Sequence, residues 1–149
     1  MSPLRNATAV AAKLGIDLEA HRSRALRSRC LADADLVIGF EPEHAIAAAD
    51  IGETPAERVF LLLELPALLE ALPRTQVSDE DDARSAIAQL DRLRTAAGWP
   101  RRAPSLPDPL GQPEQVFAEA ARVIDAVTGA LAAAVLPGRA AVSALRPAR

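Results

Sequence analysis

The sequence predicts an α/β fold in which helices cover both faces of a parallel sheet. Two apolar runs without alternation, 34–40 (ADLVIGF) and 58–63 (RVFLLL), are typical of strands buried on both faces. Segments with helical spacing of apolar residues lie between and after these runs. The order helix, strand, helix, strand, then further helices favours a three-layer α/β/α domain with about two strands and five or six helices.

The helices follow from apolar spacing and from their end signals. Residues 3–14 carry an apolar stripe that ends before Gly15, a residue suited to a C-terminal cap. Pro42 and Pro66 suit the first turns of two helices, to about Ala49 and Leu72. Further helices are predicted at 27–33, 78–98 and 113–135. Ser78 is the expected N-cap of the 78–98 helix, and the acidic residues after it suit the positive end of the helix dipole.

Composition excludes several classes of function. The net charge of −3 argues against a general nucleic-acid-binding protein, which carries clustered basic residues. No apolar run is long enough to span a membrane, and the N-terminus lacks the apolar centre of a signal peptide. A single cysteine, Cys30, cannot form an internal disulfide, so we expect the reducing cytoplasm. Two histidines, His21 and His44, make no metal-binding pattern, and we expect no metal and no cofactor.

A sheet of only two parallel strands is the difficulty in this prediction. Such a sheet leaves large apolar strand faces and unpaired edges exposed. Either a partner chain supplies the neighbouring strands, or part of the domain lies outside this sequence. Both interpretations stay open at this point.

Four motifs, in order, resemble the low-molecular-weight protein-tyrosine phosphatase family, which belongs to a superfamily with arsenate reductases. They are GIDLEAHRSRAL at 15–26, LADADLVIGFEPEH at 31–44, ERVFLLLEL at 57–65 and LPDPLGQPEQVFAEAARVIDAVTGAL at 106–131. The resemblance covers roughly residues 3–136, and residues 1–136 are therefore expected to be the C-terminal portion of such a domain. Residues 66–104 resemble the enlarged connection of bacterial members, and 137–149 are expected to be a loose tail.

The family's hallmark, Cys-x5-Arg followed by Ser or Thr, is absent from residues 1–149. Cys30 would need arginine at position 36, which is Leu36. In the family this loop binds phosphate, and its cysteine attacks phosphorus to form a cysteinyl-phosphate. We therefore expect a domain truncated at its N-terminus and inactive alone. The resemblance implies phosphorylated proteins or small phosphate esters as substrates once the loop is restored, and it leaves open phosphotyrosine, phosphoarginine or a small ester.

The resemblance assigns roles to three residues. Asp108 matches the general acid of the family's Asp-Pro loop, although an Asp before Pro109 also suits a plain turn at a helix start. Leu110 stands where many members carry an aromatic that lines the mouth of the substrate pocket. His21 matches a histidine that braces the phosphate loop. We expect Cys30 to pack in the interior and His44 to face solvent.

A second hypothesis belongs to another class of function. The chain would be a non-catalytic interaction module that pairs with itself or with a full-length paralogue through an exposed strand edge. An unrelated nucleotide-binding domain has no support, because no Gly-rich phosphate loop follows either predicted strand.

Overall fold

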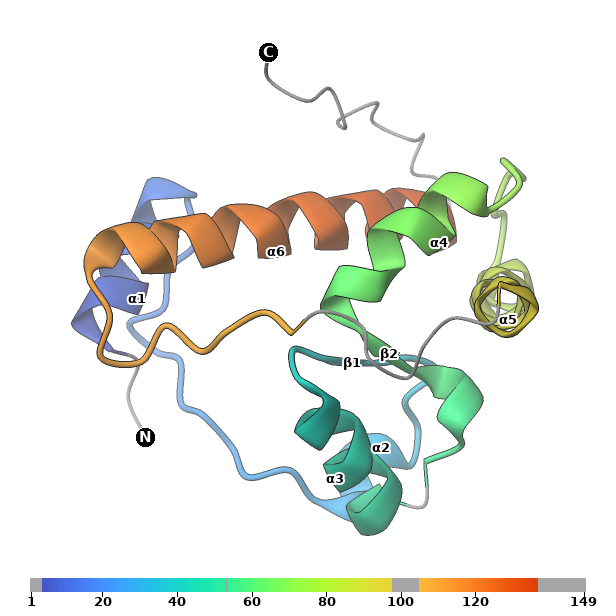
Figure 1. Cartoon of the computed structure of the whole chain (residues 1–149), viewed down its shortest axis with the longest axis horizontal. Helices are drawn as coiled ribbons and strands as arrows, with labels where there is room; N and C mark the ends of the chain where they lie inside the picture. Colours follow the sequence, from blue (N-terminus) through green and yellow to red (C-terminus); the bar gives the residue numbers. More distant parts are fainter. Residues whose placement is uncertain (1–3, 53, 98–104, 137–149) are drawn as a thin grey trace.

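The computed structural model describes residues 4–52, 54–97 and 105–136, and the predicted parallel sheet is present within them. Strand β1 (Val37–Gly39) pairs with β2 (Val59–Leu61) in parallel, with Val37 opposite Val59 and Gly39 opposite Leu61. Figure 1 shows the two strands between α2 and α3 on one side and α4 and α6 on the other. The α/β class and the incomplete, two-stranded sheet are therefore confirmed.

Six α-helices accompany the strands in the described part of the chain, close to the predicted positions. They are α1 (Arg5–Lys13), α2 (Ser28–Leu31), α3 (Pro42–Gly52), α4 (Leu65–Ala71), α5 (Glu80–Ala96) and α6 (Glu114–Val135). After α1, Gly15 adopts a φ of 75°, and the amides of Gly15 and Ile16 donate to Ala12 and Ala11 carbonyls. This is the glycine-terminated helix end that the sequence predicts. Gly98, the expected end of α5, lies outside the described residues, as does the predicted tail 137–149.

Strand β2 is shorter than the predicted strand because a side chain takes over its hydrogen bonding. The Glu64 carboxylate accepts the Leu61 amide at 3.0 Å, and a 3₁₀ turn (Leu62–Glu64) follows the strand directly. The leucines at 62 and 65 remain fully buried in this turn and in α4. The predicted apolar run 58–63 therefore contains both a strand and the start of a helical turn. The spacing of apolar residues does not show where the strand ends, because both parts are buried.

The alternating side chains of β2 divide the interior into two parts. Phe60 packs with the apolar faces of α4, α5 and α6 in the larger cluster. Val59 points to the other face and packs with Leu31 of α2 and Ala48 of α3. The segment 66–97 is thus part of the main core and not an appendage. Cys30, which was expected to pack in the interior, is exposed on α2, so that prediction is wrong.

The N-cap of α5 differs from the predicted one by one residue. Asp79, not Ser78, caps the helix, and its Oδ1 accepts the Asp82 amide at 2.9 Å. Asp82 in turn accepts the backbone amide of Ser78 at 2.9 Å, and this hydrogen bond lowers the pKa of the Asp82 carboxyl. Ser78 therefore donates its backbone amide to Asp82, and its hydroxyl also lowers the pKa of that carboxyl, but Ser78 is not the N-cap.

We predict that Asp79→Ala lowers the free energy of unfolding by about 1 kcal/mol, because the Asp82 amide loses its acceptor at a helix start. Ser78→Ala should change it by less than about 0.5 kcal/mol, as surface substitutions usually do. Urea denaturation followed by circular dichroism measures both variants. Equal losses in the two variants would contradict the assignment of the cap to Asp79.

Candidate functional site

The Asp-Pro loop runs from the carboxyl end of β1 to the start of α6. The Leu106 amide donates to the Phe40 carbonyl at 2.9 Å, which holds the loop against the residue that follows β1. Asp108 Oδ1 accepts the Leu110 amide at 3.0 Å, and Gly111, with φ of 77°, completes the turn before α6. Asp108 is therefore a turn residue, as one of the two interpretations predicts, and this geometry also fixes its side chain at the end of the sheet.

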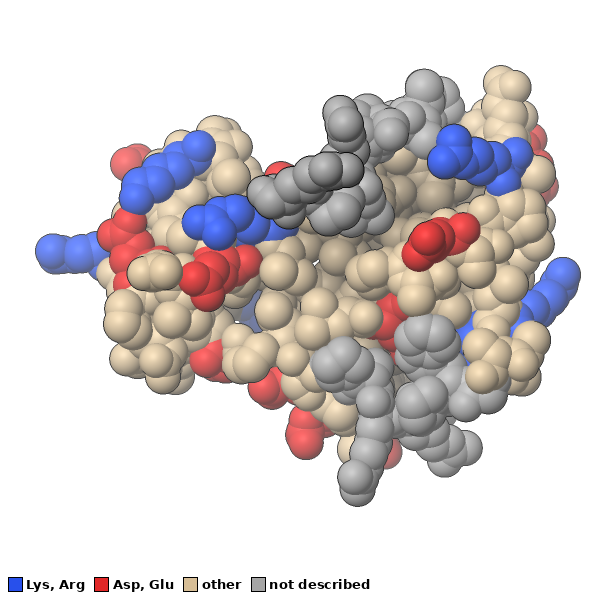
Figure 2. Space-filling view, turned by 45° about the horizontal axis from the view of Figure 1, so that its top comes forward, with Lys and Arg blue, Asp and Glu red and all other residues tan. Residues whose placement is uncertain are grey.

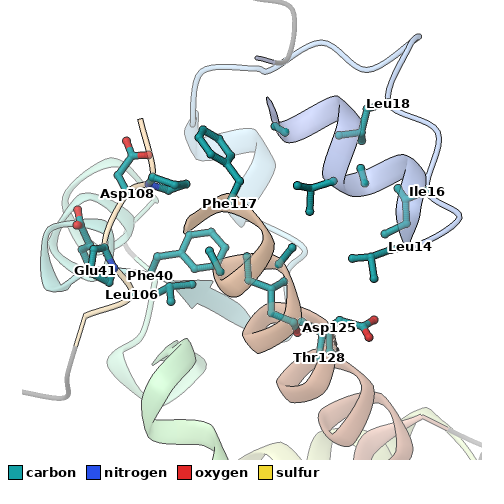
Figure 3. A pocket seen from close by; sticks show the side chains of 18 of the residues that line it. Leu14, Ile16, Leu18, Phe40, Glu41, Leu106, Asp108, Phe117, Asp125 and Thr128 are labelled. Carbon is teal, nitrogen blue, oxygen red and sulfur yellow. Dashed lines mark hydrogen bonds between the residues drawn. The ribbon is translucent and has the colours of Figure 1, made fainter. Parts of the chain in front are cut away.

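Asp108 borders a cavity of about 460 Å³ between α1, α6 and the loop. Its lining is mostly apolar, and Figure 3 shows Phe40, Leu106 and Phe117 on the same side as Asp108. Leu14, Ile16 and Leu18, from α1 and the segment after it, lie on the opposite side. The cavity thus opens where the carboxyl ends of parallel strands meet a loop, the usual place for ligands in open α/β sheets.

Three carboxylates and a histidine are the ionisable groups among the described residues that line this cavity. Glu41 lies near Asp108, and Asp125 lies beside Thr128 on the other side, as Figure 3 shows. No lysine or arginine is among these described lining residues. The cavity in the described part of the chain therefore offers a phosphate dianion no positive charge.

His44 is fixed at the start of α3 and not simply turned to solvent. Its Nδ1 accepts the Phe40 amide at 3.1 Å, so in the neutral ring the proton lies on Nε2. The Phe40 ring meets the imidazole edge-on, with the ring centroids 6.2 Å apart. The side chain is exposed, as expected, yet it also lines the cavity, which the sequence analysis did not predict.

The other two predicted site residues do not line this cavity. Leu110 is 63% exposed and borders a second hollow with Leu4 and Phe117. His21 is exposed, and its backbone amide donates to the Leu18 carbonyl at 3.1 Å. Asp108 is thus the one member of the predicted set that the structure places at the cavity.

The first part of the chain matches a known protein family. Residues 1–67 match the family described as low molecular weight phosphotyrosine protein phosphatase. Residues 1–67 are thus similar to this phosphatase family. The matched segment runs from α1 to the start of α4 and includes Phe40, Glu41 and His44, whereas Asp108 lies beyond it. No curated protein and no solved structure matches the chain.

The surface of the protein has no dominant basic face in the view of Figure 2, where Lys and Arg lie scattered among acidic residues. Within the described residues, none of the helices has the length and apolar character that a membrane crossing needs. No group of three or more potential metal ligands occurs among those residues either.

Proposed function

We propose that this chain provides the acid-bearing part of a phosphatase active site that hydrolyses phosphate monoesters on proteins. In this reaction a cysteine thiolate attacks phosphorus, and the bond from phosphorus to the ester oxygen breaks. Asp108 donates its proton to the leaving oxygen. Water then attacks phosphorus, Asp108 accepts a proton from it, and the sulfur–phosphorus bond breaks.

The position of Asp108 carries this proposal. The Leu106–Phe40 hydrogen bond holds the Asp-Pro loop at the carboxyl end of β1, and Asp108 borders the cavity there. A group at this position can reach a phosphate bound beyond the strand ends. The family match over residues 1–67 supports the same chemistry from another part of the chain.

The nucleophile and the phosphate-binding arginine would come from polypeptide outside residues 1–149. The sequence has no Cys-x5-Arg, and Cys30 is exposed on α2 and does not line the cavity. The carboxylates at the cavity would repel a phosphate dianion unless a cation accompanied it. We therefore propose that the chain alone is inactive. His21 would brace the phosphate loop, and Leu110 would line the pocket mouth, only once that loop is present. The single cysteine supports the further proposal that the protein works in the reducing cytoplasm.

We predict that the chain hydrolyses p-nitrophenyl phosphate no faster than buffer and that Asp108→Asn leaves this rate unchanged. The reason is that a general acid assists a leaving group only after a nucleophile attacks. Release of p-nitrophenolate at 405 nm, about the absorption maximum of that product, measures both rates. Turnover above buffer that Asp108→Asn abolishes would contradict the proposed inactivity while supporting the role of Asp108.

The alternative, a non-catalytic interaction module, is supported by one observation. In the described chain β1 has a strand on one side only, so its other edge has no strand neighbour there. Another copy or a full-length paralogue could add a strand at this edge. Light scattering from the purified chain separates the two proposals, because a discrete dimer favours the module and a monomer counts against it.

A further inference from the structure

The cavity beside Asp108 combines two properties that together define what can fill it. Its wall is apolar, with Phe40, Leu106, Phe117 and Ile124 among the lining residues. Its charged groups, Glu41, Asp108 and Asp125, are all acidic and come from three separate places in the chain. Figure 3 shows Asp108 and Glu41 on one side and Asp125 on the other. An occupant that carries apolar side chains flanked by cations would complement both properties.

The C-terminal residues 137–149 have this chemistry. They contain Arg139, Arg146 and Arg149 and no acidic residue. Val142 and Leu145, three residues apart, lie between the first two arginines. The segment is therefore basic although the whole chain has a net charge of −3.

The segment also begins with a reversal signal and is long enough to reach the cavity. The dipeptide Pro137-Gly138 directly follows Leu136, the C-cap of α6, and such a dipeptide is typical of turns. The cavity-lining residue Thr128 lies eight residues before Leu136, which is about 12 Å along a helix at 1.5 Å per residue. Val142 is six residues beyond Leu136, and six extended residues span about 20 Å.

We propose that residues 139–146 of the same chain bind in this cavity. Val142 and Leu145 would cover the apolar wall, and the two arginines of the segment, Arg139 and Arg146, would lie opposite the carboxylates of the cavity. The proposal does not rest on phosphatase chemistry, because it uses only the charge and the apolar surface of this chain. In a protein with the phosphate loop in place, that loop and the C-terminal segment would compete for the same space.

A spin label on the segment tests the proposal in the full chain. Cys30→Ser removes the single native thiol, which is exposed, and Ser143→Cys, at a position with no role in the proposed contact, then carries the nitroxide. Leu14, Ile16 and Ile124 all line the cavity. We expect their methyl NMR signals to be much weaker with the nitroxide than in the same sample after the nitroxide is chemically reduced. The methyl signals of Ile46, exposed on α3 and not among the cavity residues, provide the reference.

Two controls make each outcome decisive. Reversing the charges with Arg139→Glu, Arg146→Glu and Arg149→Glu should restore the cavity signals, because the segment then carries the sign of the cavity. In a second control, chain that carries the NMR isotopes but no nitroxide is mixed with chain that carries the nitroxide but no isotopes. The cavity signals should then stay intact. Three results would each overturn the proposal. The cavity signals could stay unchanged in the first experiment, or their broadening could survive charge reversal. Broadening between the mixed chains would indicate that a second copy, and not the same chain, fills the cavity.

Discussion

Phe60→Ala is expected to lower the free energy of unfolding by about 3–5 kcal/mol, the usual cost of removing a fully buried phenylalanine. Phe60 is fully buried at the centre of the core formed by β2, α4, α5 and α6. Its ring also faces the Arg94 guanidinium, 4.3 Å from the ring centroid, so the substitution removes a cation–π contact as well. Chemical denaturation monitored by circular dichroism measures the loss.

Ile46→Ala is the matched control for this prediction. Ile46 is an apolar residue on α3 that is 60% exposed, so its truncation removes little buried surface. Its effect should stay within about 0.5 kcal/mol. If Phe60→Ala were as mild as Ile46→Ala, the core described for this chain would be incorrect.

Arg94→Ala is the second substitution with a large expected effect, about 3–5 kcal/mol of unfolding free energy. Arg94 ties α5 to the sheet: its Nη1 donates to the Val59 carbonyl at 2.6 Å and to Glu64 at 3.2 Å. Its Nη2 donates to the Ala56 carbonyl at 2.9 Å and to Asp91 at 2.5 Å. The Glu64 side chain is only 7% exposed, so removal of Arg94 leaves a buried carboxylate without its cation.

A double-mutant cycle identifies the cause of that loss. Glu64→Gln removes the negative charge and keeps a side-chain oxygen that can accept the Leu61 amide. In the presence of Glu64→Gln, Arg94→Ala should therefore cost less than in the native background, with a coupling of about 0.5–3 kcal/mol. Additive losses in the cycle would show that the Arg94–Glu64 ion pair contributes nothing and that Arg94 acts through its other contacts, with backbone carbonyls, Asp91 and the Phe60 ring.

The fold could be predicted from the sequence wherever a local signal marks an element. Proline at 42 and 66 and glycine at 15 punctuate the helices, and the two apolar runs give the strands. The exact end of β2 could not be predicted, because the Glu64 carboxylate terminates the strand after Leu61. Likewise, no sequence pattern indicates that Arg94 meets residues thirty or more positions away.

The candidate site was predicted only in part, for the same physical reason. Asp108 stood out because it lies in a Pro-rich loop before a long helix, and the structure places it at the cavity. Glu41, His44 and Asp125 also line the cavity, but each looks like an ordinary residue of a helix or of a turn before one. Only tertiary packing brings them together. The sequence signal that could have drawn attention to Glu41 and His44 is their place directly after β1.

The most direct test of the central claim, that this chain holds the acid of a phosphatase site and needs a nucleophile loop from elsewhere, is a gain of activity. The experiment fuses a segment from a phosphatase of this family before Met1. The segment contains a strand, a Cys-x5-Arg-Ser loop, a helix and a second strand, and circular dichroism checks that the fusion folds. We predict hydrolysis of p-nitrophenyl phosphate that falls about 10²–10⁴-fold with Asp108→Asn and disappears when the loop cysteine is changed to serine. A folded fusion that shows no turnover, or turnover that does not depend on Asp108, would contradict the claim.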